Sequence, residues 1–129
     1  MITIKKNALV FHSREKMFTL VDKVEDYPNF LPWCSNTKVI KRTEKITKAT
    51  ISINYHKVKQ SFTTENVKVF PVKMNIKLID GPFKILKGEW SFIKIEKDAC
   101  KIEFELQYEF SNYFLDKLIS PVFNIIANT

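Results

Sequence analysis

The stretch CKIEFELQYEF, residues 100–110, alternates strictly between apolar and polar side chains. Successive side chains of a β-strand point to opposite faces, so this pattern indicates one buried face and one solvent-facing face. Antiparallel sheets commonly have this one-sided burial, whereas parallel sheets are covered on both faces. The stretch therefore predicts an antiparallel sheet that needs an apolar layer on one side only.

The same period of two recurs in most of the chain before this stretch. Apolar and polar residues alternate in segments near residues 51–55, 62–66, 72–78 and 90–94, and further candidate strands lie near residues 2–10 and 39–40. The sequences DGP at 80–82 and KD at 97–98 have the residue types of tight turns. Strands joined by such short connections pair with their sequence neighbours, so these segments are predicted to form an antiparallel meander.

Two segments have a helical period instead. Ser13 is a suitable N-cap, and the apolar residues after it recur at positions 17, 20, 21 and 24, as in an amphipathic helix. In the segment 27–34, two prolines exclude a long helix and predict a compact aromatic connection with one short helical turn. Residues 114–127 place a broad apolar stripe on one helix face, although Pro121 interrupts it.

These elements predict an α+β fold in which a curved antiparallel sheet wraps around a long C-terminal α-helix. At 129 residues the chain has the length of a single domain, 1–129, and it contains no linker or repeat. The apolar pattern runs to Thr129 without a C-cap signal, so we expect the last helix to be cut short.

Lysine dominates the charge of this chain, whose formal net charge is +7. The best basic clusters are Lys41, Arg42, Lys45 and Lys48 around one hairpin, and Lys84, Lys87 and Lys94 around another. Such groups suit a polyanionic partner or an anionic membrane. They also suit an ordinary solvated surface, which is the favoured interpretation because lysine is spread over most of the chain and arginine, the better phosphate ligand, is rare.

Several classes of protein are excluded or disfavoured by composition. With two glycines and no glycine-rich phosphate loop, the chain lacks the usual nucleotide-binding motifs. Cys34 and Cys100 have no metal-ligand spacing, so no metal site is expected. Free thiols and the lack of an N-terminal apolar signal predict a cytoplasmic protein, with peripheral contact at the inner membrane left open.

Catalytic candidates are few. His12 and His56 are both expected to be exposed near the ends of elements, and neither has a nucleophile and an orienting acid at a useful spacing. Ser13 is explained as a helix cap and the cysteines as small buried hydrophobic residues. The sequence therefore predicts a non-enzymatic protein with no catalytic residue and no cofactor.

Aromatic residues are placed to face the predicted C-terminal helix from several strands. The candidates for contact with a hydrophobic ligand are Phe30, Leu31, Trp33, Phe62, Phe83, Trp90, Phe92, Phe104, Tyr108 and Phe123, and Phe110 is also expected to point inward. Flat apolar rings suit such a ligand, and tyrosine O–H or tryptophan N–H groups suit its polar end. The same rings serve equally as core packing, which the residues alone favour.

Several motifs, in order, resemble those of one known family over essentially the whole chain. They are Tyr27-Pro28-x-Phe30-Leu31-Pro32-Trp33-Cys34, Asp80-Gly81-Pro82-Phe83, Leu86-x-Gly88-x-Trp90-x-Phe92, Cys100-x-Ile102-x-Phe104 and Pro121-Val122-Phe123. The series is similar to that of the START-like coenzyme Q-binding and ribosome association toxin family, and closest to its bacterial, RatA-type branch.

The resemblance implies a START-like helix-grip fold, which agrees with the elements predicted above. It implies an isoprenoid quinone such as ubiquinone, or another lipid, bound between sheet and helix in support of respiration. In the toxin branch it implies binding to the 50S ribosomal subunit, which blocks 70S formation. The candidates for contact with the ribosome or a membrane are Lys41, Arg42, Lys45, Lys84 and Lys87. A small-molecule cyclase or hydrolase of the same superfamily is the alternative function.

Overall fold

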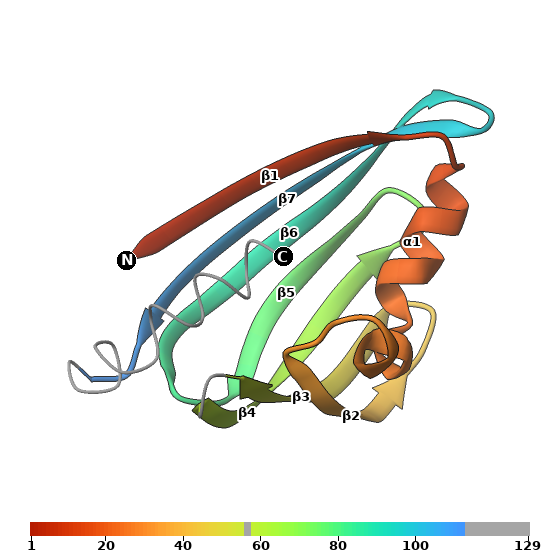
Figure 1. The fold of residues 1–129 in the computed structure, drawn as a ribbon. Helices are drawn as coiled ribbons and strands as arrows, with labels where there is room; N and C mark the ends of the chain where they lie inside the picture. The colour runs from red at the N-terminus through yellow and green to blue at the C-terminus, as the bar shows by residue number, and fades with distance from the viewer. Residues whose placement is uncertain (56–57, 113–129) are drawn as a thin grey trace.

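The computed structural model describes residues 1–55 and 58–112, which form one seven-stranded antiparallel sheet with two short helices on one side (Figure 1). The strands are β1 (Ile2–Val10), β2 (Cys34–Arg42), β3 (Ile46–Tyr55), β4 (Val58–Val69), β5 (Lys73–Asp80), β6 (Phe83–Glu96) and β7 (Ala99–Phe110). The helices are α1 (Arg14–Asp22) and the 3-10 helix η1 (Val24–Asn29). The predicted C-terminal helix, residues 114–127, lies outside the described residues.

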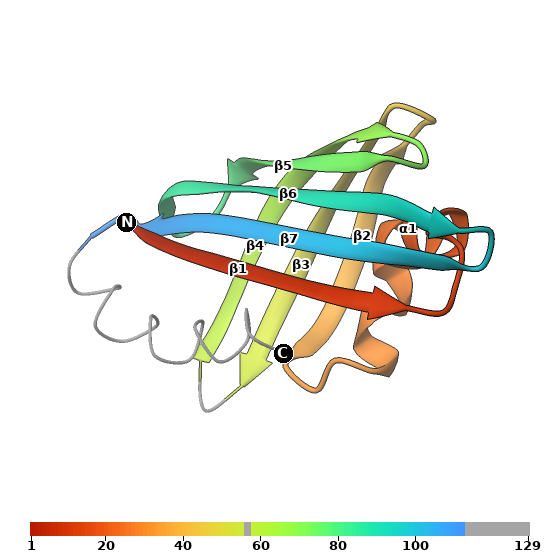
Figure 2. The same cartoon turned by 90° about the horizontal axis from the view of Figure 1, so that it is seen from above.

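The predicted meander is confirmed for β2 to β7, each of which pairs with its neighbour in sequence. The sequence pattern predicted a strand near residues 2–10, which is β1, but it did not predict which strand pairs with it. Strand β1 pairs with β7 in a register that sets Ile4 opposite Leu106 and Ala8 opposite Ile102. The sheet order is therefore β1-β7-β6-β5-β4-β3-β2, with the first strand beside the last (Figure 2).

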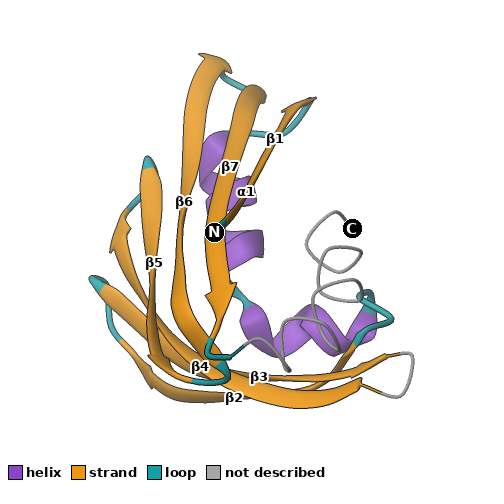
Figure 3. Ribbon diagram, turned by 90° about the vertical axis from the view of Figure 1, so that its left-hand side faces the viewer, coloured by secondary structure: helices purple, strands orange, loops and turns teal. Residues whose placement is uncertain are grey.

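The sheet is strongly curved, and α1 and η1 lie inside its curve (Figure 3). We call the inner surface the concave face and the outer surface the convex face. The even-numbered residues of β7 point to the concave face, where Cys100, Leu106, Tyr108 and Phe110 are buried. The odd-numbered residues of this strand point to the convex face and are exposed or half-buried. The alternation predicted for residues 100–110 is confirmed.

Helix α1 begins as the sequence predicts. The Ser13 side chain accepts a hydrogen bond from the backbone N–H of Lys16 at 3.2 Å, which satisfies one of the free donors of the first turn. The helix ends at Asp22, before the last apolar position of its predicted stripe. That position, Val24, is the first residue of η1 and is buried there. The short helical turn expected in the proline-containing segment is η1, which contains Pro28.

The core of the described residues has two clusters. The first contains Ile4, Ile53, Phe83, Leu86, Leu106, Tyr108 and Phe110. The second contains Phe18, Met74, Phe92, Cys100 and Ile102, and it anchors α1 because Phe18 is the buried residue of that helix. Burial of apolar area on the concave face is thus what holds the helix to the sheet.

Gly88 permits close packing in the middle of the sheet. It lies on β6 between Ile76 of β5 and Leu106 of β7. A Cβ atom at this position would lie 2.8 Å from the carbonyl oxygen of Glu105 and 3.2 Å from the Cδ1 atoms of Ile76 and Leu106. Any side chain at this position would displace both the backbone of β7 and the core side chains on either side, which explains the glycine.

Candidate functional site

The concave face gathers most of the aromatic side chains that the sequence proposed for ligand contact. In the first cluster, half-buried Trp33, Phe62 and Phe104 pack against buried Phe83 and Tyr108. These residues come from the connection before β2 and from β4, β6 and β7. Segments far apart in the sequence therefore present their rings to one apolar cluster.

Phe83 is at the centre of this cluster. Its ring stacks on Phe110 with centroids 4.8 Å apart, and it meets Phe62 and Tyr108 edge-on at 5.7 and 6.4 Å. Tyr108 has an exposed fraction of 0%. Rings this deeply buried serve packing, so contact with a ligand is best suited to the half-buried members of the cluster.

Trp90 and Phe92 belong to the second cluster. Trp90 connects the two clusters, because its ring lies 4.4 Å from that of Phe104 and 6.3 Å from that of Phe92. Phe92 itself is buried against Phe18 of α1, with ring centroids 5.3 Å apart. Of these two predicted ligand residues, Trp90 is half-buried on the concave face and Phe92 is a packing residue.

The indole N–H of Trp33 has a property that was not predicted from the sequence. Its indole Nε1 is buried and has no hydrogen-bond partner in the described part of the chain. The backbone holds the residue in place: its carbonyl accepts from the N–H of Asn54, and the N–H of Cys34 donates to Leu31, both at 3.0 Å. Buried donors are nearly always paired, so this N–H has the chemistry to meet an acceptor on a bound molecule.

Phe30 is a prediction that the structure corrects. Its side chain was expected to point inward, but it is 55% exposed and packs only edge-on against Tyr27, at 5.9 Å. The residue follows η1 directly, and the turn of this helix directs its ring away from the core. Leu31 is half-buried. Phe123 lies outside the described residues.

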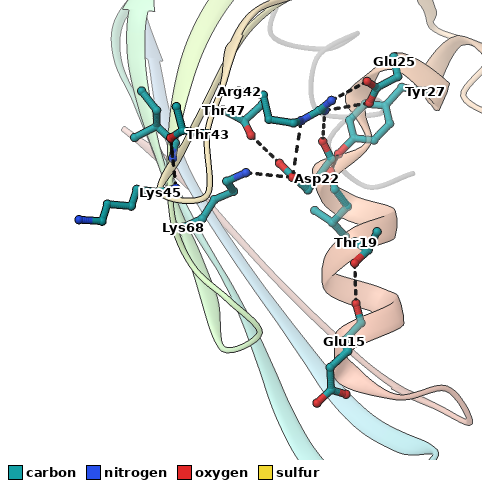
Figure 4. A network of polar contacts seen from close by, with 12 residues as sticks. Glu15, Thr19, Asp22, Glu25, Tyr27, Arg42, Thr43, Lys45, Thr47 and Lys68 are labelled. Carbon is teal, nitrogen blue, oxygen red and sulfur yellow. Dashed lines mark hydrogen bonds and ion pairs between the residues drawn. The ribbon is translucent and has the colours of Figure 1, made fainter.

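A polar network joins the end of α1 to the concave face of β3 and β4 (Figure 4). The carboxylate of Asp22 accepts from the Thr47 hydroxyl at 2.7 Å and pairs with the Lys68 ammonium at 3.0 Å. The Lys68 side chain is 5% exposed and that of Asp22 is 17% exposed, so this ion pair is largely buried. The sequence contained the signal, because Lys68 stands at an inward position of the β4 alternation, but the network itself was not predicted.

Arg42 extends this network to η1. Its guanidinium donates to both carboxylate oxygens of Glu25, at 2.6 and 2.8 Å, and to the backbone carbonyl of Asp22 at 2.8 Å. The hydrogen bond to Arg42 lowers the pKa of the Glu25 carboxyl, and the same bond raises the pKa of Arg42. Arg42 was predicted as a surface contact for a ribosome or membrane, but its charge is already used to tie β2 to the helices.

The other predicted surface lysines are exposed. Lys41, Lys45 and Lys87 lie open to solvent, and Lys84 does so within 3.9 Å of the Glu109 carboxylate. Lys45 also borders an open pocket of about 540 Å³ beside α1, which is lined by Phe18, Thr19, Asp22, Glu44, Lys45, Lys68 and Phe70. This pocket contains none of the predicted ligand residues, and its charged lining does not suit a prenyl chain.

The few catalytic candidates of the sequence have other places in the described residues. His12 is exposed, Ser13 caps α1, and His56 lies outside the described residues. Burial raises the pKa of the Cys34 and Cys100 thiols, which makes them poorer nucleophiles. Within residues 1–55 and 58–112, no group of three His, Cys, Asp or Glu side chains could hold a metal ion.

The sequence pattern of one protein family, described as polyketide cyclase / dehydrase and lipid transport, matches residues 10–129. The chain belongs to this family. Within it, the chain is similar to the ribosome association toxin RatA of Vibrio cholerae, with 37% identity over 97% of this chain and 87% of that protein. It is more distantly similar to the mitochondrial coenzyme Q-binding protein COQ10 of Drosophila melanogaster, with 25% identity over 95% of this chain and 52% of that protein.

Solved structures show the same START-like fold. The protein TTHA0849 from Thermus thermophilus superposes with a TM-score of 0.81 at 15% identity, over 98% of this chain and 86% of that one. The Zhui aromatase/cyclase of Streptomyces sp. R1128 has a TM-score of 0.75 at 9% identity, over 86% of this chain and 69% of that one. The same fold thus occurs in an aromatase/cyclase, and a likeness at this level of identity shows the fold and does not assign an activity to this chain.

None of the described helices is long and apolar enough to cross a bilayer.

Proposed function

We propose that this protein binds an isoprenoid quinone against the concave face of its sheet, and that it acts as a binding protein rather than an enzyme. The observation that carries the proposal is the buried, unpartnered Trp33 Nε1 beside the aromatic cluster. A quinone ring presents carbonyl oxygens that accept hydrogen bonds but donate none. Its prenyl chain is apolar and suits half-buried aromatic surfaces.

The distribution of polar groups supports this ligand class. Phe62 and Phe104 present hydrocarbon to the cluster. Buried Lys68 and its partner Asp22 belong to the polar network beside α1, and Lys6, which is opposite Phe104 on the same face, is exposed. The similarity to a protein named for coenzyme Q binding supports the same class. A cyclase or hydrolase would require paired titratable groups facing the ligand. In the described aromatic cluster the titratable side chains are Tyr55 and Tyr108, and Tyr108 is 0% exposed.

Replacing Trp33 by phenylalanine is expected to weaken binding of a short-chain ubiquinone by about 2- to 10-fold, because one hydrogen bond contributes about 0.5–1.5 kcal/mol. The ligand-free variant should be as stable as the wild type or more so, since a buried unsatisfied donor is removed. Isothermal titration in mild detergent measures the first quantity and urea denaturation the second.

Trp90→Phe is the matched control, because it removes the other indole of the chain. It should reduce affinity less than Trp33→Phe does. Equal affinity of wild type and Trp33→Phe for the quinone would overturn the role of this donor. Organic extraction of the purified protein that yields no prenyl quinone by mass spectrometry would overturn the ligand class.

A second function, association with the 50S ribosomal subunit that blocks 70S formation, is favoured by the net charge of +7 and by the name of the toxin relative. We propose that the two functions use different surfaces, the concave face for the quinone and the outside of the molecule for the ribosome. A cytoplasmic location with peripheral contact at the inner membrane would give access to both partners.

In sucrose gradients, added protein is expected to migrate with 50S subunits and to reduce the 70S peak. Unchanged 70S particles, with the protein remaining at the top of the gradient, would refute ribosome association and leave the quinone proposal intact.

A further inference from the structure

We infer that a row of four lysines across the convex face, Lys87, Lys77, Lys48 and Lys41, binds ribosomal RNA phosphates; this inference rests on the proposed ribosome association. Hereafter we call these four residues the lysine row. The row includes Lys41 and Lys87 from the predicted contact residues and Lys48 from one of the basic clusters of the sequence. The strand register adds Lys77, and Arg42, Lys45 and Lys84 are not part of the row.

The register of the sheet builds the row. Lys87 of β6 is opposite Lys77 of β5, and Lys48 of β3 is opposite Lys41 of β2. Glu65 of β4 stands between the two pairs, opposite both Lys77 and Lys48. Neighbouring strands lie about 4.8 Å apart, so five adjacent strands extend the row over about 19 Å. An extended, regular line of charge suits a phosphate backbone better than it suits a small anion.

The ammonium groups of the row are available for a partner. Lys41, Lys77 and Lys87 are exposed and Lys48 is half-buried. In the described part of the chain none of the four forms an ion pair within 4.0 Å, whereas Lys68 and Lys101 pair with carboxylates at 3.0 and 3.5 Å. One glutamate among four lysines leaves the row strongly positive.

The convex face is divided by charge. Over β7 it carries Glu103, Glu105 and Glu109 against Lys101, with Lys5 of β1 opposite Glu105, so that half of the face has no excess of positive charge to attract a polyanion. The lysine row lies on the other half, from β6 to β2. A phosphate backbone is therefore expected to bind along the row and not over β7. This localised positive charge is the charge complementarity that an RNA-binding surface needs.

The surroundings of the row favour RNA over a membrane. Next to it, Thr50 and Thr63 share a hydrogen bond of 2.7 Å, and Ser52 and Ser61 one of 2.9 Å. Hydroxyl groups also bond phosphate and sugar oxygens of nucleic acids. Apolar side chains near the row are partly exposed, at 43% for Val67 and 42% for Ile79. The most exposed one among the described residues, Phe11 at 90%, lies instead after β1, at the end of the sheet near the β6–β7 hairpin. A membrane contact would be expected there, away from the row.

The test compares the variant Lys48→Gln/Lys77→Gln with the control Lys5→Gln/Lys101→Gln in the full chain. Both lose two charges, but the control residues lie on the β1 and β7 half of the convex face. Binding to purified 50S subunits is measured by sedimentation at increasing KCl. The row variant should bind about tenfold more weakly at 0.1–0.15 M salt, and its slope of log K against log salt should fall by about 2, because each lysine–phosphate contact contributes about 1.

The control should keep the wild-type affinity and slope. If wild type binds 50S subunits and the row variant matches the control, the lysine row is wrong and ribosome association stands. If wild type itself does not bind, ribosome association fails and the row fails with it. If the row variant keeps 50S affinity but loses binding to vesicles containing phosphatidylglycerol, the row is a membrane surface, which also overturns the inference. Unchanged thermal unfolding of all variants shows that each is folded.

Discussion

Replacing Asp22 by alanine is expected to lower the free energy of unfolding by about 3–5 kcal/mol, because it leaves a buried lysine without its counter-ion. The Lys68 side chain is 5% exposed and its ammonium lies 3.0 Å from the Asp22 carboxylate. The substitution also removes the acceptor of the Thr47 hydroxyl and the ion-pair partner of Arg42 at 3.7 Å. Urea denaturation followed by circular dichroism measures the loss.

A rescue variant separates two contributions to the loss of stability: the unpaired charge of Lys68 and the missing contacts of Asp22. The double substitution Asp22→Ala/Lys68→Met should recover most of the stability, since an apolar side chain of similar length replaces the buried ammonium. If Asp22→Ala costs less than about 1 kcal/mol, the range of a surface pair, then Lys68 has access to water and the network is not buried. If the double variant is no more stable than the single one, the loss comes from α1 and not from the charge.

Replacing Phe92 by alanine is expected to cost about 3–5 kcal/mol, the range for a large aromatic residue removed from a core. Phe92 is 1% exposed and packs against Phe18, through which α1 is anchored to the sheet. The cavity would therefore weaken both the second core cluster and the attachment of α1. The matched control is Phe11→Ala, since Phe11 is 90% exposed and should change stability by less than about 0.5 kcal/mol.

Hydrogen exchange distinguishes the two parts of this prediction. Amides of α1 should lose protection in Phe92→Ala more than amides of β3 and β4, because the helix loses its anchor while those strands keep their own pairing. A uniform loss of protection would mean that the second cluster stabilises the whole sheet equally. A stability equal to that of Phe11→Ala would mean that Phe92 is not a core residue.

Local pattern was enough to predict most of the sheet. The alternation of residues 100–110 places Tyr108 and its even-numbered neighbours inward, as the structure does, and short turns make neighbouring strands pair. The place of β1 was not predictable in this way. Its partner is almost a hundred positions away in the sequence, and alternation states which face is buried without stating which strand lies alongside.

In the candidate site, the direction of a side chain was predictable where a regular strand buries it. It was not predictable where a single tertiary contact holds the side chain. Phe62 and Phe104 lie in regular parts of their strands, so their period determined their direction, whereas Phe83 precedes a register shift in β6 and is out of phase with the inward residues after it. Phe30 follows a 3-10 helix, where a period of two has no meaning, and its ring is exposed. Arg42 is located at a strand end, and only the fold brings Glu25 within 2.6 Å of it. Pairings of this kind depend on tertiary distances that no local pattern encodes.

Charge is unevenly distributed over the convex face, with the lysine row from β6 to β2 and three glutamates over β7. Lysines at the β2 end and carboxylates at the β7 end make the β2 end turn toward any polyanion before the surfaces touch. Approach in this orientation increases the fraction of collisions that lead to a complex, and so acts on the rate of association. Because charges are screened beyond about 8–10 Å at 0.1–0.15 M salt, added salt should slow capture even where the bound state is unchanged.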